Sequence, residues 1–198
     1  MFKEVKIEQN SPEWAIWRHS GIGASDIPVI LGLSAYKSRS KLLAEKKQEN
    51  PPENKKNYIL AMGHLAEKKM RAYINLIKNV QLKSACYEST EKPYTYMKVS
   101  LDGICDSFIW ECKICGWKKF EHIKKGEVPE DFYAQVQYQM YIMNKDYSIL
   151  SACRFDGVEV FYHKIVSLIV KQNKKYQNET IIPAVEKLWS EVQNNVIS

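Results

Sequence analysis

Two apolar segments that alternate with polar residues, 94–101 and 109–114, constrain the fold of this chain most strongly. Side chains in a strand change direction at every residue, so the alternation predicts two β-strands. The polar pair Asp106-Ser107 between the two segments allows the chain to turn back. We therefore expect neighbouring strands, with Asp102 at the end of the first strand and close to the second.

The second strand carries an acid and an amine two residues apart. Glu111 and Lys113 are expected to project from one face of that strand, side by side. The alternate residues project from the opposite face, and they are Trp110, Cys112 and Ile114. The pattern thus places a carboxylate beside an ammonium group, in the strand that neighbours the first.

Asp102, Glu111 and Lys113 together suggest a metal-dependent site that cuts phosphodiester bonds. Two carboxylates from neighbouring strands can hold one hard cation through oxygen ligands, as Mg²⁺ prefers. The same residues also fit ordinary patterns, because Glu-x-Lys on a strand is typical of an exposed ion pair and Asp-Gly is typical of a turn. These three residues alone leave both interpretations open.

Composition bounds the domain organisation and the kind of partner. With 198 residues, of which 45% are hydrophobic, the chain is expected to form a single domain over residues 1–198. Its 29 Lys and Arg residues exceed its 23 Asp and Glu residues, and the resulting charge of +6 favours a polyanionic partner. No apolar run is long enough to cross a membrane, and residues 1–6 lack the apolar core of a signal peptide, so we expect a soluble, cytoplasmic protein.

The chain contains five cysteines, an odd number that argues against a disulfide framework and predicts reduced thiols. They are Cys86, Cys105, Cys112, Cys115 and Cys153. Cys112 and Cys115 have the spacing of metal ligands, but a second cysteine pair or a histidine pair is missing. We therefore expect neither a structural metal site nor an iron–sulfur cluster.

Helix and hairpin signals surround the two strands. Helices are expected over residues 12–20, 38–47, 57–78 and 131–144. A short helix is expected to begin within residues 21–26, and residues 166–196 are expected to be largely helical with a break at Pro183. Residues 148–155 and 158–165 are expected to form a hairpin, residues 48–56 an exposed loop, and residues 116–126 a loop after the second strand. This order of elements implies an α/β or α+β arrangement of layers around one mixed sheet.

Glu67 and the pair Gln135 and Gln139 lie on two of the expected helices, and the sequence allows either a surface position or a role in a site for each. Glu67 lies at the edge of an apolar arc, where it either reaches solvent or is held inward to serve a cation. Gln135 and Gln139 lie four residues apart, away from the apolar stripe of their helix. They form a surface amide ladder, or Gln135 positions a water molecule or a phosphate.

Two segments have the chemistry to contact an anion. Ser25 and Asp26 stand where a short helix is expected to begin, which suits either an anion or an ordinary helix cap. Residues 116–126 interleave aromatic and basic side chains, which suits either phosphate binding or a solvated surface. Both interpretations remain open for each segment.

Six motifs occur in a fixed order along the chain. They are Trp17-Arg18, Gly21 to Asp26, Gly63 to Glu67, Ser100 to Gly103, Glu111 to Lys113, and Tyr133 to Tyr138. Their order and spacing, over roughly residues 12–165, resemble the YqaJ/lambda exonuclease family of phage recombination nucleases. The resemblance implies a restriction-endonuclease-like PD-(D/E)XK core, in which helices flank a mixed central β-sheet.

The resemblance assigns a metal site to both strands. Asp102, Glu111 and the backbone carbonyl of Cys112 would bind Mg²⁺, with Mn²⁺ able to substitute. Glu67 would hold a metal-bound water molecule or a second ion, and Lys113 would orient or deprotonate the attacking water. These roles agree with general chemistry, because a bound cation lowers the pKa of water and offsets charge that develops on the phosphate.

The resemblance also assigns contacts to phosphate groups. Gln135 would help to position the water molecule or the scissile phosphate. Arg18, Ser25 and Ser100 match family residues that form a pocket for the terminal 5′-phosphate, and Lys119 stands where the family places a basic residue. Such a pocket would make the protein an exonuclease.

The implied reaction is Mg²⁺-dependent digestion of linear duplex DNA from 5′-phosphorylated ends to mononucleotides. It would leave a 3′ single strand for a single-strand annealing protein, in a bacterial cell that carries the phage or prophage, and family members can form homotrimers. Two positions depart from the family pattern, because Leu101 replaces a proline and Cys112 an aliphatic residue. The alternatives are a non-catalytic DNA-binding or interaction module on this fold, and a Cas4-like iron–sulfur nuclease, against which the cysteine pattern argues.

Overall fold

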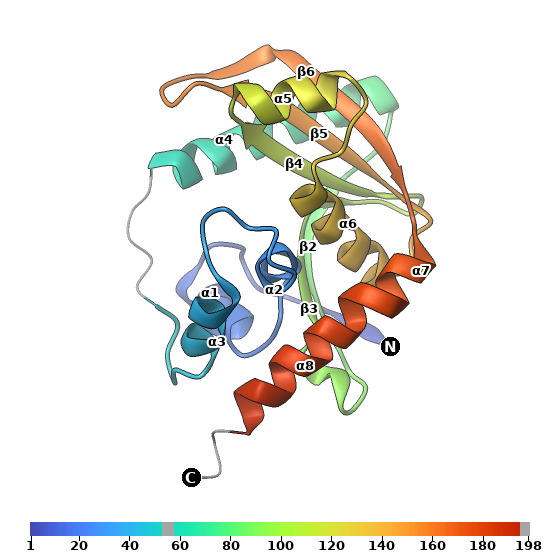
Figure 1. Cartoon of the computed structure of the whole chain (residues 1–198). Coiled ribbons are helices and arrows are strands. Elements are labelled where there is room, and N and C mark those ends of the chain that lie inside the picture. Colours follow the sequence, from blue (N-terminus) through green and yellow to red (C-terminus); the bar gives the residue numbers. More distant parts are fainter. Residues whose placement is uncertain (53–57, 195–198) are drawn as a thin grey trace.

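A six-stranded mixed sheet forms the centre of the computed structural model, which describes residues 1–52 and 58–194 (Figure 1). The strands, in their order across the sheet, are β1 (Phe2–Val5), β2 (Lys83–Ser89), β3 (Lys98–Ile104), β4 (Ile109–Cys115), β5 (Tyr147–Phe155) and β6 (Val160–Lys171). β4 and β5 pair in parallel, whereas the other neighbouring strands pair antiparallel. The predicted mixed sheet is confirmed.

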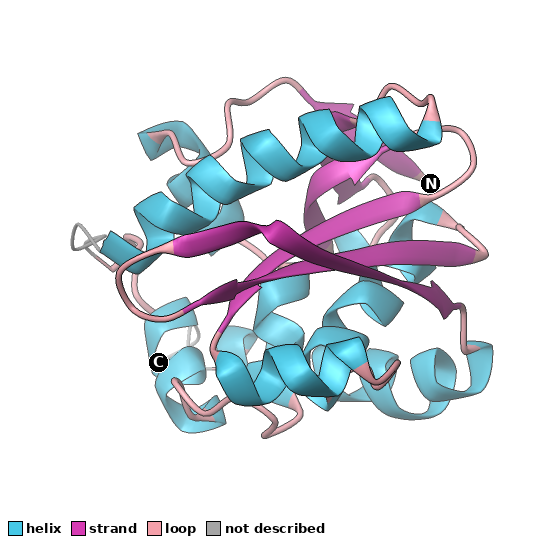
Figure 2. Ribbon diagram, turned by 90° about the horizontal axis from the view of Figure 1, so that it is seen from above, coloured by secondary structure: helices cyan, strands magenta, loops and turns pink. Residues whose placement is uncertain are grey.

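Helices cover both faces of this sheet (Figure 2). They are α1 (Pro12–His19), α2 (Ile27–Ile30), α3 (Arg39–Lys46), α4 (Tyr58–Lys78), α5 (Trp117–Lys124), α6 (Glu130–Met143), α7 (Lys174–Tyr176) and α8 (Ile182–Gln193). Ala24–Asp26 and Tyr94–Tyr96 form 3-10 turns, and Gln177–Ile181 forms a π-helical turn. α4 packs on one face of the sheet, and α5 and α6 pack on the other.

Capping chemistry determines where the N-terminal part of the chain becomes helical. The Ser11 hydroxyl accepts a hydrogen bond from the Trp14 N–H at 3.1 Å, and Pro12 occupies the first helical position of α1, as predicted. The short helix expected to begin within 21–26 is the Ala24–Asp26 turn, which continues directly into α2. Local sequence alone therefore accounts for this region.

The strand that carries Asp102 begins later than its alternation predicts. β2 and β3 pair antiparallel, so the chain must reverse its direction between them. Residues 90–97 make this reversal, and Tyr94–Tyr96 form a turn there. The prediction of a strand over 94–101 is wrong at its start, and Asp102 lies inside β3 rather than at its end. The polar pair at 106–107 does form the turn between β3 and β4.

The C-terminal hairpin is longer than predicted. β6 continues its pairing with β5 as far as Lys171, opposite Tyr147, so the helix expected from residue 166 begins only at Lys174. The break predicted at Pro183 is a π-helical turn just before it, and the proline lies in the first turn of α8. Residues 195–196 of the predicted helix lie outside the described part of the chain.

Three elements escape the sequence patterns. β1 has only four residues, and neither β1 nor β2 shows clear alternation of apolar and polar residues. The prediction of a loop over 116–126 is wrong, because the parallel pair β4 and β5 needs a crossover and α5 forms part of it. Of the other predicted loop, residues 53–56 lie outside the described residues.

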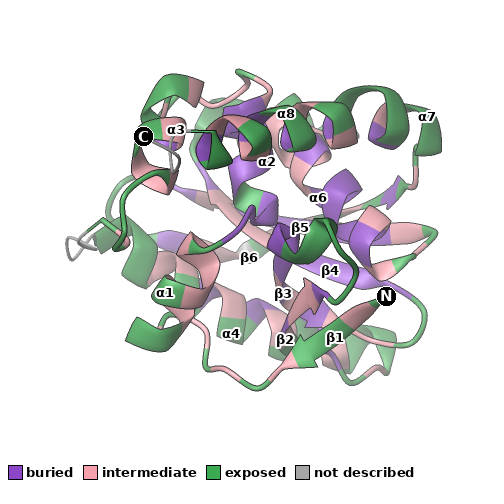
Figure 3. Cartoon of the chain, turned by 90° about the horizontal axis from the view of Figure 1, so that it is seen from below, coloured by how far each residue is buried: buried purple, intermediate pink, exposed green. Residues whose placement is uncertain are grey.

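Buried residues lie along the strands of the sheet and on the helices that cover it (Figure 3). On one face, Met70 of α4 packs with Trp110 of β4 and Cys153 of β5. On the other face, buried residues of α2, α6 and α8 pack together with those of β3. All five cysteines are free thiols, as predicted. In the described ranges, no helix has both the length and the apolar character that crossing a membrane requires.

Candidate active site

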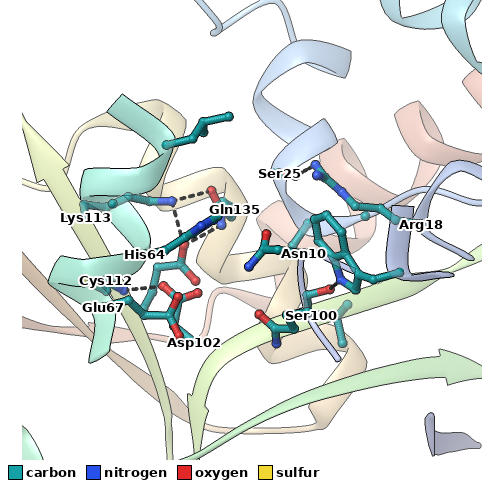
Figure 4. A pocket seen from close by; sticks show the side chains of 18 of the residues that line it. Asn10, Arg18, Ser25, His64, Glu67, Ser100, Asp102, Cys112, Lys113 and Gln135 are labelled. Atoms are coloured by element: carbon teal, nitrogen blue, oxygen red, sulfur yellow. Dashed lines mark hydrogen bonds and ion pairs between the residues drawn. The ribbon is translucent and has the colours of Figure 1, made fainter. Parts of the chain in front are cut away.

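A cavity of about 310 Å³ lies between the N-terminal segment, α4 and the strands β3 and β4 (Figure 4). The sequence-predicted residues that line it are Arg18, Ser25, Glu67, Ser100, Asp102, Glu111, Cys112, Lys113 and Gln135. Figure 4 shows Glu67, Asp102 and Lys113 toward one end, and Arg18 and Ser100 toward the other. The fold therefore brings together residues that are far apart in the sequence.

β3 and β4 pair next to the turn that joins them, and this pairing does not extend to Asp102. Gly103 and Ile104 are the β3 residues that pair with β4. Beyond them a side chain replaces the backbone as the partner, because Asp102 Oδ2 accepts the Cys112 N–H at 2.8 Å. The strands separate where Asp102 and Glu111 stand, and this separation opens one end of the cavity.

Glu111 is almost fully buried and is held by three donors. Its Oε1 accepts hydrogen bonds from Lys113 Nζ and Gln135 Nε2, both at 2.6 Å. Its Oε2 accepts one from Gln139 Nε2 at 2.6 Å. The predicted side-by-side position of Glu111 and Lys113 is confirmed. The surface-ladder interpretation is wrong, because packing between the sheet and other helices buries Gln139 completely.

Lys113 is fixed between two oxygens of the site. Its Nζ donates to Glu111 Oε1 and, at 2.9 Å, to Gln135 Oε1. Burial alone would lower the pKa of this ammonium group, but the carboxylates of Glu111 and Asp102 outweigh burial and raise its pKa above the ordinary value. Lys113 is therefore a charged hydrogen-bond donor at neutral pH.

α4 places Glu67 at the same end of the cavity, where Arg71 hydrogen-bonds both Glu67 and β3. Arg71 Nη1 donates to Glu67 Oε1 at 3.1 Å and to the backbone carbonyl of Asp102. Burial raises the pKa of Glu67 and the nearby Glu111 carboxylate adds to the rise, whereas Arg71 opposes it. The inward-facing interpretation of Glu67 agrees with this geometry. Arg71 was not predicted, although its position four residues after Glu67 is a signal for such a pair.

Glu67, Asp102 and Glu111, here called the carboxylate cluster, have the chemistry to hold a divalent cation. Burial and the charges of Glu111 and Glu67 raise the pKa of Asp102 well above its ordinary value. This mutual repulsion is the condition that a cation relieves. Burial also raises the pKa of the Cys112 thiol well above its ordinary value, so its backbone carbonyl is the better ligand for a hard ion.

The carboxylate cluster does not form a complete cage. Within residues 1–52 and 58–194, no three acidic, histidine or cysteine side chains are gathered closely enough to hold an ion alone. Mg²⁺ commonly uses one or two carboxylates and completes its six ligands with water and other oxygens. The donor set therefore fits Mg²⁺ better than it fits an ion bound entirely by side chains.

Trp14 links the residues at the opposite end of the cavity. Arg18 Nη2 donates to the Ser25 hydroxyl, and the Arg18 guanidinium carbon lies 5.0 Å from the centre of the Trp14 ring. Trp14 Nε1 donates to the Ser100 hydroxyl at 2.8 Å. These four residues, here called the Arg18 cluster, combine a guanidinium, two hydroxyls and an indole, a set that suits a phosphate group. Trp14 was not among the predicted residues.

A buried ion pair supports the Arg18 cluster. Lys46 Nζ lies 3.2 Å from Asp26 Oδ2, which also accepts the Gly23 N–H at 3.0 Å. Asp26 Oδ1 lies 3.9 Å from Arg18 Nη2. Of the two residues expected at this helix start, Asp26 therefore has the structural role, and Ser25 lines the cavity.

Lys98 is a buried cation in the cavity wall that sequence reasoning missed. Its Nζ donates to the Trp17 carbonyl and to the Ser20 hydroxyl, and it lies 5.1 Å from the centre of the Trp17 ring. Burial lowers the pKa of Lys98 to about 8. The charge of this wall therefore changes in the mildly alkaline range.

A Lys98→Met variant should diverge from the wild-type protein in the pH dependence of stability. The pKa of Lys98 is about 8 when folded and near 10.5 when unfolded, so the unfolded chain binds more protons between these values and wild-type stability rises with pH. In urea denaturation, the wild-type free energy of unfolding should rise by about 2 kcal/mol relative to the variant between about pH 7.5 and about pH 9.5. A constant difference between the two proteins would contradict this expectation. Replacement of the exposed Lys118 by Met is the control.

The structure does not bring Lys119 into the Arg18 cluster. Residues 117–124 form α5, and there Lys119 pairs with Asp131 and lies 4.5 Å from the centre of the Phe132 ring. Lys119 is not part of the cavity lining. Lys113 Nζ lies 5.4 Å from the same ring, which is the shared neighbour of the two lysines. The position implied for Lys119 by the resemblance is therefore not reproduced.

Sequence comparisons find one matching family model and one similar protein. A family model described as the YqaJ-like viral recombinase domain matches residues 13–146. The uncharacterized protein YqaJ of Bacillus subtilis (strain 168) is 24% identical over 211 residues, covering 95% of this chain. The alignment spans 66% of the length of that relative.

Solved structures share the fold. An alkaline exonuclease (LHK-Exo) from Laribacter hongkongensis superposes with a TM-score of 0.76 at 18% identity, over 94% of both chains. The same enzyme in complex with dAMP gives 0.77, also over 94% of both chains. A phage-related exonuclease from Haemophilus somnus 129PT gives 0.59 at 13% identity, over 88% of this chain and 92% of that one. The predicted PD-(D/E)XK fold, with helices around a mostly antiparallel mixed sheet, is confirmed.

Proposed function

Because the chain belongs to the YqaJ-like viral recombinase domain family, we propose that it is a divalent-metal-dependent exonuclease that digests linear duplex DNA from 5′-phosphorylated ends. The products would be mononucleotides and a 3′ single strand, as phage-type recombination by single-strand annealing requires. One observation carries the proposal: a single cavity holds the carboxylate cluster at one end and the Arg18 cluster at the other (Figure 4). Groups suited to cutting and groups suited to a terminal phosphate thus share one space.

The residues that would hold the cation are Asp102, Glu111 and the backbone carbonyl of Cys112, with Glu67 beside them. Mg²⁺ is the proposed ion and Mn²⁺ a substitute, because both accept carboxylate, carbonyl and water oxygens. When bound, such a cation supplies charge that offsets the phosphate and lowers the pKa of an attached water molecule. Arg71 holds Glu67 at a fixed position relative to β3, so the cluster is assembled before an ion arrives.

Lys113 and Gln135 would act on the scissile phosphate and the attacking water. Lys113 Nζ lies between Glu111 Oε1 and Gln135 Oε1, from where it would donate hydrogen bonds that orient the attacking water and stabilise developing negative charge. Gln135 both donates to Glu111 and accepts from Lys113, which fixes the direction of its amide. The two side chains therefore present a preorganised polar surface toward the cavity.

An Arg18→Ala variant should lose the preference for 5′-phosphorylated ends. Arg18 supplies the charged, forked donor of its cluster, and a hydrogen bond from such a group to phosphate contributes about 1.5–3 kcal/mol. The kcat/KM for duplex with a 5′-phosphate should fall roughly tenfold to a hundredfold, whereas that for a 5′-hydroxyl end should change little. An Arg39→Ala variant, which removes a surface arginine paired with Glu191, is the control. Equal losses on both kinds of end would contradict the assignment of the cluster.

Two partners belong to the same proposal. A homotrimer and a single-strand annealing protein are expected from the family resemblance, and the 3′ single strand is the chemistry that an annealing protein would bind. The charge of +6 suits the DNA substrate itself. Light scattering of the purified chain, alone and with duplex DNA, tests the oligomer.

The test of the proposed function compares linear and covalently closed circular duplex DNA in Mg²⁺. The proposal predicts loss of the linear form to acid-soluble nucleotides, no loss of the closed circle, and full inhibition by a chelator. Binding of both forms without cleavage in Mg²⁺ or Mn²⁺ would instead identify a non-catalytic DNA-binding module. A brown protein with bound iron would identify the iron–sulfur alternative.

A further inference from the structure

Gln139 contacts the carboxylate cluster from the side opposite the cavity. It lies on α6, is 0% exposed and is not part of the cavity lining, yet its Nε2 donates to Glu111 Oε2 at 2.6 Å. Gln135, one turn earlier on the same helix, reaches the other oxygen of Glu111 from the cavity side. Two amides of one helix thus hold the two oxygens of one carboxylate.

The stability of the core does not explain a glutamine at this position. Among the described buried side chains, Gln139 Oε1 is one of two polar atoms that lack a hydrogen-bond partner, the other being the Tyr162 hydroxyl. A buried acceptor without a donor is destabilising, and an apolar side chain of similar length would avoid it. The amide cannot reverse, because its oxygen would then face the Glu111 carboxylate. Its orientation therefore serves Glu111.

The hydrogen bonds leave one acceptor position on Glu111. A carboxylate offers about four lone-pair sites, two on each oxygen. Lys113 and Gln135 occupy both sites of Oε1, and Gln139 occupies one site of Oε2. As far as the hydrogen bonds of the described residues show, the second site on Oε2 is the only one on Glu111 that remains for a cation. A bidentate bond needs a free site on each oxygen, so it would require the carboxylate to turn and either Lys113 or Gln135 to release Oε1.

We propose that Gln139 is a positioning residue: by anchoring Oε2 it keeps the Glu111 carboxylate from turning, so that Oε1 stays with Lys113 and Gln135, only Oε2 can reach a cation, and Mg²⁺ is favoured over Ca²⁺. Mg²⁺ demands a near-ideal octahedron of single oxygen ligands, whereas the larger Ca²⁺ accepts bidentate carboxylates and more ligands. A carboxylate limited to one bond thus matches the smaller ion. The inference rests on the proposed function, since it concerns the same metal site.

The test measures cation binding in the absence of DNA, with a Gln139→Met variant. Free Mn²⁺ is followed by its electron paramagnetic resonance signal during titration of the protein, and Mg²⁺ and Ca²⁺ are then added as competitors. The dissociation constant for Mg²⁺ should rise about tenfold or more, as expected when an outer partner of a ligand is lost. The constant for Ca²⁺ should change less, so the ratio of the two affinities moves toward Ca²⁺.

Gln137→Met is the matched control. Gln137 is also 0% exposed on α6, but it bonds the Lys171 carbonyl and the Asn173 N–H, each at 2.8 Å, away from the site. Loss of this buried amide should lower stability and leave the ratio of Mg²⁺ to Ca²⁺ affinities unchanged. The control thus separates a general effect of core damage from an effect on the metal.

Each result decides a different claim. If the Gln139→Met variant and the wild type show the same affinity ratio, the inference about Gln139 is overturned and the proposed function stands. If the wild type binds neither Mg²⁺ nor Mn²⁺, the proposed function fails and the inference with it. Should the Met variant not fold, Gln139→Asn, whose shorter amide stays polar but withdraws from Glu111, is measured in the same way with the same expected shift.

Discussion

A Lys113→Met variant should cleave linear duplex DNA about a thousandfold more slowly than the wild type, within the range found for positioned proton-transfer and charge-stabilising groups. Methionine has a similar length, so it occupies the space of the lysine stem but cannot donate to a phosphate oxygen or a water molecule. Gln135 still donates to Glu111 Oε1, so the carboxylate keeps two of its three donors. The loss should therefore appear in kcat, measured under saturating DNA in Mg²⁺.

DNA binding is the companion measurement for Lys113. Fluorescence anisotropy with labelled duplex in Ca²⁺ should show affinity within a few-fold of wild type, because the Arg18 cluster is untouched. The control is Lys145→Met, which removes a lysine that donates to the Asp106 carbonyl and does not line the cavity. Retention of more than about a tenth of wild-type kcat in Lys113→Met would remove Lys113 from the proposed mechanism.

An Asp102→Asn variant should lose cleavage by about a thousandfold and gain stability when no divalent cation is present. Asn can still accept the Cys112 N–H, so the hydrogen bond between β3 and β4 survives. The substitution removes a half-buried carboxylate that Glu111 and Glu67 repel, which should raise the free energy of unfolding by about 1 kcal/mol at neutral pH. Opposite effects on activity and stability distinguish a ligand from a structural residue.

The stability difference between wild type and Asp102→Asn should depend on pH and on Mg²⁺. The pKa of Asp102 is raised in the folded state, so the folded protein binds more protons and wild-type stability falls as pH rises above the unfolded value near 3.8. Saturating Mg²⁺ should restore stability to the wild type and not to the variant. Thermal unfolding with and without Mg²⁺ measures both effects, with Asp106→Asn in the exposed turn as control. A variant less stable than the wild type at neutral pH without Mg²⁺ would contradict the account.

The parts of the site that follow from local periodicity could be predicted from the sequence. Alternation along one strand was enough to place Glu111 and Lys113 on a common face, because a strand repeats its direction every two residues. The helical period likewise placed Glu67 at the edge of a buried arc, and the structure holds it inward. The resemblance then supplied the Arg18 cluster except for Trp14, which lies outside the quoted motifs.

The parts that depend on tertiary packing could not be predicted. Gln139 looks like a surface residue by its polarity, and only the position of α6 between the sheet and other helices buries it. The pair of Asp102 with the Cys112 N–H arises because β3 and β4 separate, which no local pattern records. Lys119 falls outside the cavity because α5 is imposed by the crossover between two parallel strands. Each of these outcomes is set by contacts between distant segments.

The most direct test of the central claim follows the two ends of one strand of a linear duplex. A duplex with 5′-phosphorylated ends is labelled at either the 5′ or the 3′ terminal nucleotide and mixed with the protein in Mg²⁺. The account predicts that the 5′ label appears first, as a mononucleotide, that the 3′ label stays in long single strands, and that a chelator stops both. Earlier release of the 3′ label, or no release of either label in Mg²⁺ or Mn²⁺, would contradict it.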